Sequence, residues 1–300
     1  MGTDDTPAVA GSEITSDPDA SSPASDPDAS NPESDPETIP GSIRESIAES
    51  VASRRAGYGA VGLAAFVAIW HLVSLTQPSY VLPTPAAVGA TFIEEAASGG
   101  LTVAIGQSVL HWIPGTIAGT TLGVAAGVIA GWSRTADDLT SPVVRLLRPV
   151  PPLALIGFAI AWFGINHAGA AFIIAIGAFW INFYAAYGGV EGVSEDLLDV
   201  GRSLGISGDR DLLRHIVIPA ASPEILTGIR TGIGRCWMLV VAAEIFGVPG
   251  IGRRILRASN NLQVDVVIAY ILVLSLLFLL VDATFRAVQR RLLVWRGEAR

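Results

Sequence analysis

Six runs of apolar residues constrain the fold of this chain more than any other feature. A run of about 20 such residues can cross the hydrocarbon core of a bilayer as a helix, which satisfies its own backbone hydrogen bonds. Hydrophobic residues make up 51% of the chain, and the mean hydropathy of +0.52 is high for a soluble domain. The runs cover residues 56–77, 109–132, 149–165, 168–190, 224–247 and 264–284. They predict an all-α, polytopic integral membrane protein with about six transmembrane helices.

Two of these runs have a composition that bears on helix packing. The second run, 109–132, is rich in Gly, Ala and Thr, which lets helix backbones approach closely. The third run, 149–165, is short and begins with Pro149, Pro151 and Pro152. A proline in the first turn of a helix loses little, because the N–H that it lacks has no partner there. We therefore expect a tightly packed second helix and a third helix that begins at its prolines.

A polar, charged stretch between the fourth and fifth runs, residues 191–223, is long for a loop of a membrane protein. Apolar and small residues recur at helical spacing on both sides of Gly205, which can adopt a left-handed turn. Pro219 then marks the return towards the membrane. The residues at helical spacing are Leu197, Gly201 and Leu204 before the turn and Leu212, Ile216 and Ala220 after it. The pattern predicts two amphipathic helices that dock onto a partner; an ordinary polar loop is the alternative.

The same stretch resembles the cytoplasmic loop of permease subunits of binding-protein-dependent ABC importers. That loop carries Glu-Ala-Ala, then Gly, then an aliphatic residue shortly before Leu-Pro. Here Asp199-Val200-Gly201 stands in place of Glu-Ala-Ala, Gly205 in place of the Gly, and Ile218-Pro219 in place of Leu-Pro. The chain departs from the pattern in two ways, since aspartate replaces glutamate and one extra residue separates Gly205 from Pro219.

The resemblance continues outside the loop and covers residues 57–295. It is closest to the group that imports aliphatic sulfonates, taurine, nitrate and, in some members, pyrimidine precursors. The matching motifs follow one another in the family's order: Val81-Leu82-Pro83-Thr84-Pro85, Leu147-Arg148-Pro149-Val150-Pro151-Pro152-Leu153-Ala154, Trp162-Phe163-Gly164, Ala243-Glu244 and Gly250-Ile251-Gly252. On this resemblance, residues 56–295 form a transmembrane permease domain whose coupling loop is 191–223.

The family resemblance implies the partners and the solute. Two copies of the permease, expected as a homodimer, would form the pathway in the lipid membrane, and an extracytoplasmic solute-binding protein would deliver a small anionic solute of the sulfonate, taurine or nitrate type. A pyrimidine or thiamine precursor is the alternative solute. A dimer of ABC ATPase subunits would seat against the loop. The residues expected to couple the two subunits are Asp199, Gly201, Arg202, Leu204, Gly205 and Pro219.

The chain itself lacks the features of an ATPase. It contains no lysine, so it cannot form a Gly-x-x-x-x-Gly-Lys phosphate-binding loop, and ATP must be bound by a separate polypeptide. No Cys or His spacing suggests a metal site, and we expect no cofactor and no nucleic-acid partner. The sequence therefore predicts a non-catalytic transport subunit.

Two other classes of membrane protein remain open. Gly205-Ile206-Ser207-Gly208, with His215 nearby, matches the Gly-x-Ser-Gly of rhomboid intramembrane proteases. Such a protease needs its serine and histidine inside the membrane, and here charged residues flank the motif. A secondary transporter is the other alternative, although it would show inverted repeats and broken helices, which the sequence does not.

The distribution of arginine predicts the orientation in a cell membrane, because basic loops stay in the cytoplasm. With six spans, the arginines before the first run, between the second and third runs, in the coupling loop and after the last run all lie on one side. Both termini are therefore expected in the cytoplasm. Arg253, Arg254 and Arg257 fall on the outer side and violate the rule.

The two ends of the chain differ from the permease domain. Residues 1–40 hold ten acidic residues and no basic ones, so they predict a disordered acidic tail. Residues 41–55 are expected to form a cytoplasmic amphipathic lead-in, and residues 296–300 a cytoplasmic tail. Without the acidic tail, 19 basic and 17 acidic residues leave residues 41–300 with a net charge of +2.

Charged residues within the fifth run are candidates for the translocation pathway, because ionisable groups are costly in a membrane. Arg235 lies near the middle of the run, and Glu244 follows nine residues later. Arg235 would favour anions in a water-filled pathway. The alternative is that it packs against a neighbouring helix or reaches the inner surface. At about 1.5 Å per residue the two are about 13 Å apart along one helix, so they are not partners within it.

Overall fold

A computed structural model describes residues 41–206 and 208–292, without the side chains of residues 41–53, 55, 56, 290 and 292. The chain divides into two units, residues 1–61 and residues 62–300. All regular elements of the described ranges are helices, as the sequence predicted. The acidic tail 1–40, the C-terminal tail 296–300 and Ser207 lie outside the described residues.

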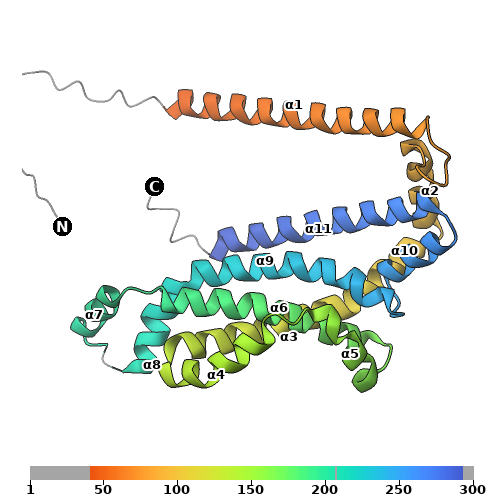
Figure 1. Ribbon diagram of the computed structural model, residues 1–300. Coiled ribbons are helices and arrows are strands. Elements are labelled where there is room, and N and C mark those ends of the chain that lie inside the picture. The colour runs from red at the N-terminus through yellow and green to blue at the C-terminus, as the bar shows by residue number, and fades with distance from the viewer. Residues whose placement is uncertain (1–40, 207, 293–300) are drawn as a thin grey trace, which may run out of the picture. The chain divides into compact units, whose positions relative to one another are not determined.

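The helices follow one another with short connections (Figure 1). Their bounds are α1 Gly41–Ser74, α2 Pro85–Ala97, α3 Gly100–Trp132, α4 Arg134–Leu147, η1 Pro152–Leu155, α5 Ile156–Phe163, α6 His167–Glu191, α7 Glu195–Ser203, α8 Asp209–Leu212, η2 Leu213–Val217, α9 Ile218–Ile245, α10 Ile251–Asn260 and α11 Val264–Leu292.

Five helical stretches in the described part of the chain are long and apolar enough to cross a membrane. They are Gly57–Ser74, Gly100–Trp132, His167–Glu191, Asp209–Ile245 and Val264–Gln289. A sixth span results if α4 and the following stretch Pro152–Phe163 are counted together, although the two are bent by 84°. The count agrees with the predicted six spans.

The third predicted span, 149–165, is not one straight helix. A 3-10 turn, η1, leads into α5, which has 8 residues and is therefore only about 12 Å long, too short to cross a bilayer alone. The prolines explain the difference: Pro151 is in an extended conformation and separates α4 from η1. The polypeptide therefore bends at this point instead of continuing as one straight helix, and a sixth span is present only if the two bent parts are counted as one.

The α6 helix packs closely against α3 between Gly115 and Gly131, and a stripe of glycines on α3 makes this possible (Figure 1). A β-carbon added at any of five α3 positions would lie 2.9 Å or closer to a carbonyl oxygen of α6. The positions recur every four residues: Gly115, Gly119, Gly123, Gly127 and Gly131. The predicted close packing of the second span is therefore an approach of two backbones, with α6 as the partner.

The α9 helix begins earlier than predicted. The expected second helix of the loop is not separate, because α8, the π-helical turn η2 and α9 form one stretch from Asp209 to Ile245. Pro219 does not end this stretch. A proline removes the N–H that would bond to the carbonyl four residues earlier, and the wider π turn just before it accommodates the loss.

Two polar contacts join α9 to α11 within this unit. Arg230 Nε lies 2.9 Å from Asp282 Oδ1, and the indole N–H of Trp237 donates to the carbonyl of Leu274 at 3.0 Å. Two of the ionisable groups in the predicted fifth and sixth spans thus bind each other.

We predict that Gly123→Ile destabilises the protein, because a side chain at this position collides with the α6 backbone at Phe179. Overpacking of this kind costs about 1–3 kcal/mol. The midpoint of thermal unfolding of the purified full chain in detergent measures the effect. Gly106→Ile is the matched control on the same helix, since a β-carbon there has no neighbour within 4 Å. Equal midpoints for the two variants would contradict the role of the stripe.

Candidate functional site

The helix α7 is the centre of the polar loop that the sequence singled out. Glu195 and Asp196 in its first turn and Arg202 in its last complement the helix dipole. Arg202 Nη1 also lies 2.7 Å from Asp199 Oδ1, with both side chains more than half exposed. An exposed pair of this kind stabilises a fold by well under about 1 kcal/mol. These charged side chains therefore favour the two ends of α7, and they add little to the contact of α7 with the rest of the protein.

Gly205 ends α7 in a Schellman motif. Its N–H bonds to the carbonyl of Arg202 at 3.0 Å, and the N–H of Ile206 bonds to the carbonyl of Gly201 at 3.1 Å. The φ angle of Gly205 is +92°, which agrees with the predicted left-handed turn. No atom lies within 4 Å of a β-carbon built there, so the backbone conformation rather than crowding requires glycine.

One face of α7 is docked onto the helical unit. Gly201 is buried, and a β-carbon there would collide with the side chain of Ile216 and lie 3.2 Å from Leu212 Cδ2. Leu198 packs against the buried cluster at the adjoining ends of α6 and α9, formed by Ala186, Val190, Val217, Ala221 and Ile225. The absence of a side chain at Gly201 therefore fixes how closely α7 approaches the stretch that becomes α9.

Beside this docked face, α7 exposes several apolar side chains. Leu204 is 77% exposed and Val200 is 53% exposed, and Leu197 is also exposed. Exposed apolar groups held on a docked helix are typical of a surface that contacts a partner. Figure 1 shows α7 and α8 together at one end of α9, with α10 at the other.

The buried carboxylate of Glu244 joins three helices at that other end. Ser108 Oγ on α3 donates to Glu244 Oε1 at 2.5 Å and accepts the N–H of Ile251 at 3.0 Å. The N–H of Gly252 donates to Glu244 Oε2. Glu244 and Ser108 are fully buried. The carboxylate therefore fixes the start of α10 against α9 and α3.

Two histidines extend this junction to α6. His111 Nε2 lies 3.0 Å from Glu244 Oε1, and His111 Nδ1 lies 3.0 Å from His167 Nδ1. The two rings stack with centroids 5.3 Å apart. Sequence analysis found only Glu244 of this group. Ser108 and His111 are 136 and 133 residues away along the chain, and no local pattern links them to it.

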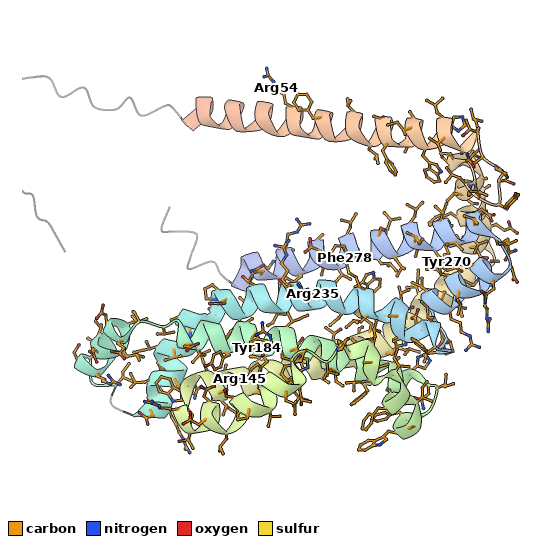
Figure 2. The ribbon with its side chains drawn as sticks, in the orientation of Figure 1. Arg54, Arg145, Tyr184, Arg235, Tyr270 and Phe278 are labelled. Atoms are coloured by element: carbon orange, nitrogen blue, oxygen red, sulfur yellow. The ribbon has the colours of Figure 1, made fainter. Side chains whose placement is uncertain are left out.

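The structure separates the two residues proposed for the pathway. Arg235 is exposed on α9 (Figure 2), and no ion pair to it occurs among the described residues. Glu244 is inaccessible in the single chain, and both of its oxygens are bonded.

A second acidic group, Glu95, lies near the start of α10. The hydroxyl of Tyr270 donates to Glu95 Oε2 at 2.6 Å, and Arg254 Nη2 lies 2.5 Å from Glu95 Oε1. Burial raises the pKa of Glu95, but the hydrogen bonds from Tyr270 and Arg254 and the charge of Arg254 outweigh it, so the pKa lies below its ordinary value. Figure 2 labels Tyr270 in the part of α11 near α2 and α10. Glu95 thus ties α2 to α10 and α11.

The described residues offer little for metal binding or catalysis. Among them no group of three or more His, Cys, Asp or Glu side chains is placed to hold a metal ion. Gly205, Gly208 and His215 lie in the loop at one end of α9, and the serine between the two glycines is outside the described residues.

Comparison with known proteins gives a consistent result. Residues 119–294 match the family described as "Binding-protein-dependent transport system inner membrane component". This range contains α3 from Gly119 onward and all elements through α11, including the loop with α7 and Glu244 itself.

Three relatives resemble most of the chain. It is 31% identical to a chain of Bacillus subtilis described as an aliphatic sulfonates transport permease protein, covering 87% of this chain and 96% of that one. It is 32% identical to the taurine transport system permease protein of Escherichia coli, with 79% and 88% covered. It is 31% identical to the nitrate import permease protein of a Synechocystis species, with 74% and 84% covered.

A solved structure of an amino acid ABC transporter with histidines has a similar fold. The TM-score is 0.52 at 16% identity, and the match covers 66% of this chain and 94% of that one. About two thirds of the chain therefore share their fold with a transporter of known structure.

We predict that Tyr270→Phe makes the protein less stable in acid. The lowered pKa of Glu95 means that its ionised form stabilises the fold above the ordinary pKa of the group, and that this stability is lost as the pH falls through the lowered value. Removing the Tyr270 hydroxyl raises the pKa of Glu95, so the loss begins at a higher pH.

Thermal unfolding midpoints of the purified chain between about pH 3 and pH 7 test this prediction. Thr91→Val is the control, since it removes the nearby hydrogen bond to Asp265, 2.7 Å long, and leaves Glu95 intact. An acid limb that Tyr270→Phe does not move would contradict the assigned role of the hydroxyl.

Proposed function

The chain belongs to the family of inner membrane components of binding-protein-dependent transport systems, and from this premise we propose that its α7 loop couples it to a separate ATPase. The protein is a multi-pass, non-enzymatic permease subunit of an ABC importer.

One observation carries the coupling role. The α7 helix has two apolar faces: Leu198 and Gly201 pack against the helical unit, whereas Val200 and Leu204 are exposed. Packing of α7 on the helical unit does not require the exposed apolar side chains, so we attribute them to contact with a partner. We assign the exposed face to a cleft on the ATPase, with Asp199 and Arg202 at its edge, Gly205 fixing its turn and Pro219 at the start of α9.

The connection from this loop to the membrane supports transmission of motion. The stretch Asp209–Ile245 is continuous and about 55 Å long at 1.5 Å per residue. Its first part, with Leu212, contacts α7, and its last part holds Glu244 in the junction with α3 and α10. A displacement of α7 by the ATPase would therefore move both ends of one rigid element, and with it the gate between inward-facing and outward-facing states.

The remaining parts of the transporter follow from the family. Two copies of this chain would form the pathway as a homodimer, a pair of ATPase subunits would bind ATP, and an extracytoplasmic binding protein would deliver the solute. With the α7 loop in the cytoplasm, both termini are cytoplasmic. The acidic segment 1–40 is then an extension on the ATPase side.

We assign a small anionic solute of the sulfonate, taurine or nitrate type. The relatives described for these solutes support this choice, and a pyrimidine or thiamine precursor is the second candidate. Arg235, exposed on α9, remains our candidate for a pathway residue. The bonded and inaccessible carboxylate of Glu244 instead suits a structural role at the start of α10.

We predict that Gly205→Val uncouples the transporter. A β-branched residue at a φ of +92° costs about 1–2 kcal/mol or more, so the loop leaves this conformation and the exposed face of α7 is misplaced. Liposomes containing the permease, its ATPase and its binding protein measure solute-stimulated ATP hydrolysis and uptake. Both should be lost while the permease remains in the membrane.

Gly208→Val is the matched control in the same loop. Gly208 has φ −84° and ψ 133°, which any residue adopts, and its closest neighbour is the movable side chain of Asp211. This variant should retain coupling. Wild-type hydrolysis and uptake in Gly205→Val would overturn the assignment of the loop.

A further inference from the structure

An open cavity of about 670 Å³ lies beside α10 and contains three arginines. Its wall comes from the turn between α2 and α3, the first part of α3 and the segment from Pro249 onward. The residues that matter most for its chemistry are Arg253, Arg254, Arg257, Gln107 and Ser98. Its volume is in the range of pockets that bind small molecules.

The cavity has an excess of positive charge. No acidic side chain lines it. Arg254 is bound to Glu95, and Arg253 Nη1 donates to the carbonyl of Gly247. Arg257 is exposed, and no ion pair or hydrogen bond to its side chain occurs in the described parts of the chain. Of the three arginines in the lining, Arg254 is therefore neutralised by a carboxylate, whereas Arg253 and Arg257 are not.

The rest of the wall restricts what can bind. The first N–H groups of α10 are already occupied by Ser108 and Glu244, so the helix terminus is not available to a ligand. The guanidinium groups are the remaining charged donors, and a planar guanidinium presents paired N–H groups that match the oxygens of an oxyanion. The amide of Gln107 and the hydroxyl of Ser98 add neutral donors.

From these observations we infer that the cavity beside α10 binds a small oxyanion of the sulfonate or nitrate class, with Arg257 and Arg253 as its charged ligands. The inference rests on the proposed function, in which α10 is on the outer side. It identifies the place where the anionic group of the solute is held after the binding protein releases it. It also explains why three arginines lie on the side of the membrane where basic residues are disfavoured.

Arg257 is the residue to change, because it makes no contact that the fold requires. We expect the purified full-length permease, in nanodiscs of phosphatidylcholine, to bind ethanesulfonate or nitrate in calorimetric titrations and not to bind choline. Arg257→Gln should weaken this binding by about tenfold or more, the loss expected for one charge-assisted hydrogen bond. Arg257→Lys should weaken it less, since the charge remains but the paired donors are lost.

Arg145→Gln is the control for loss of one positive charge, since Arg145 is exposed on α4, away from the cavity (Figure 2). It should bind the probe anions as the wild type does. Arg253→Gln, which also removes the contact with Gly247, should weaken binding as Arg257→Gln does. An unchanged affinity in Arg257→Gln, or no binding of either anion by the wild type, overturns the inference.

Three further outcomes distinguish an anion site from a lipid-binding or protein-docking surface and from failure of the transport role itself. If Arg257→Gln and Arg253→Gln differ from the wild type only in nanodiscs that contain phosphatidylglycerol, the arginines bind lipid headgroups and the inference is wrong. If Arg257→Glu weakens association with the binding protein but not anion binding, they form a protein-docking surface, and the inference is again wrong. Absence of uptake by the complete wild-type transporter would reject the proposed function, whereas uptake that Arg257→Gln leaves unchanged would reject only the cavity.

Discussion

The close approach of α3 to α6 is the constraint on which the remaining contacts depend. In a membrane, lipid is as apolar as leucine, so helices associate through tight packing and polar contacts rather than through the hydrophobic effect. Five glycines spaced by four residues let the α6 carbonyls lie against the α3 backbone. At the centre of this contact the buried amide of Asn182 donates to Thr120 Oγ1 at 3.2 Å and to the Ala178 carbonyl at 2.7 Å. The α9 helix then packs on α6, and the loop and α10 are placed by α9.

The contacts at the two ends of this packed unit differ in kind: they are polar at the Glu244 end and apolar at the α7 end. At one end Glu244 receives donors from Ser108 and Gly252 and lies beside His111, so α3, α9 and α10 share one carboxylate. A buried charge is tolerated only when it is bonded in this way, and removing one partner would leave the others unsatisfied. At the other end α7 packs through apolar contacts on the stretch that becomes α9. The outer side of α7 carries exposed apolar side chains. One end of α9 thus shares a buried carboxylate with its neighbours, and the other lies beside the exposed apolar side chains of α7.

Features determined by a few neighbouring residues could be predicted from the sequence. The turn at Gly205 and the close packing of the Gly-rich second span are of this kind, and so is the number of apolar spans. The bend at Pro151 and the continuation of the helix through Pro219 were not predicted. Whether a proline ends a helix depends on the backbone before it, and the π turn Leu213–Val217 cannot be seen in a pattern of residue types. The Glu244 junction joins residues more than 100 positions apart, so only the fold brings them together.

The exceptions to the sequence rules have one physical cause. Three arginines of α10 violate the rule that basic residues stay on the inner side, and a carboxylate within the fifth apolar run is expensive in a membrane. The carboxylate is compensated by the N–H of Gly252 and the hydroxyl of Ser108, which also accepts the N–H of Ile251, and it orients the first turn of α10. That orientation places Arg253, Arg254 and Arg257 along one cavity, where Glu95 neutralises only Arg254. The buried negative group thus holds the helix, and the helix holds the positive groups where an anion can reach them. Without the bonds to Glu244 and Ser108, the first turn of α10 would lose the contacts that position its arginines.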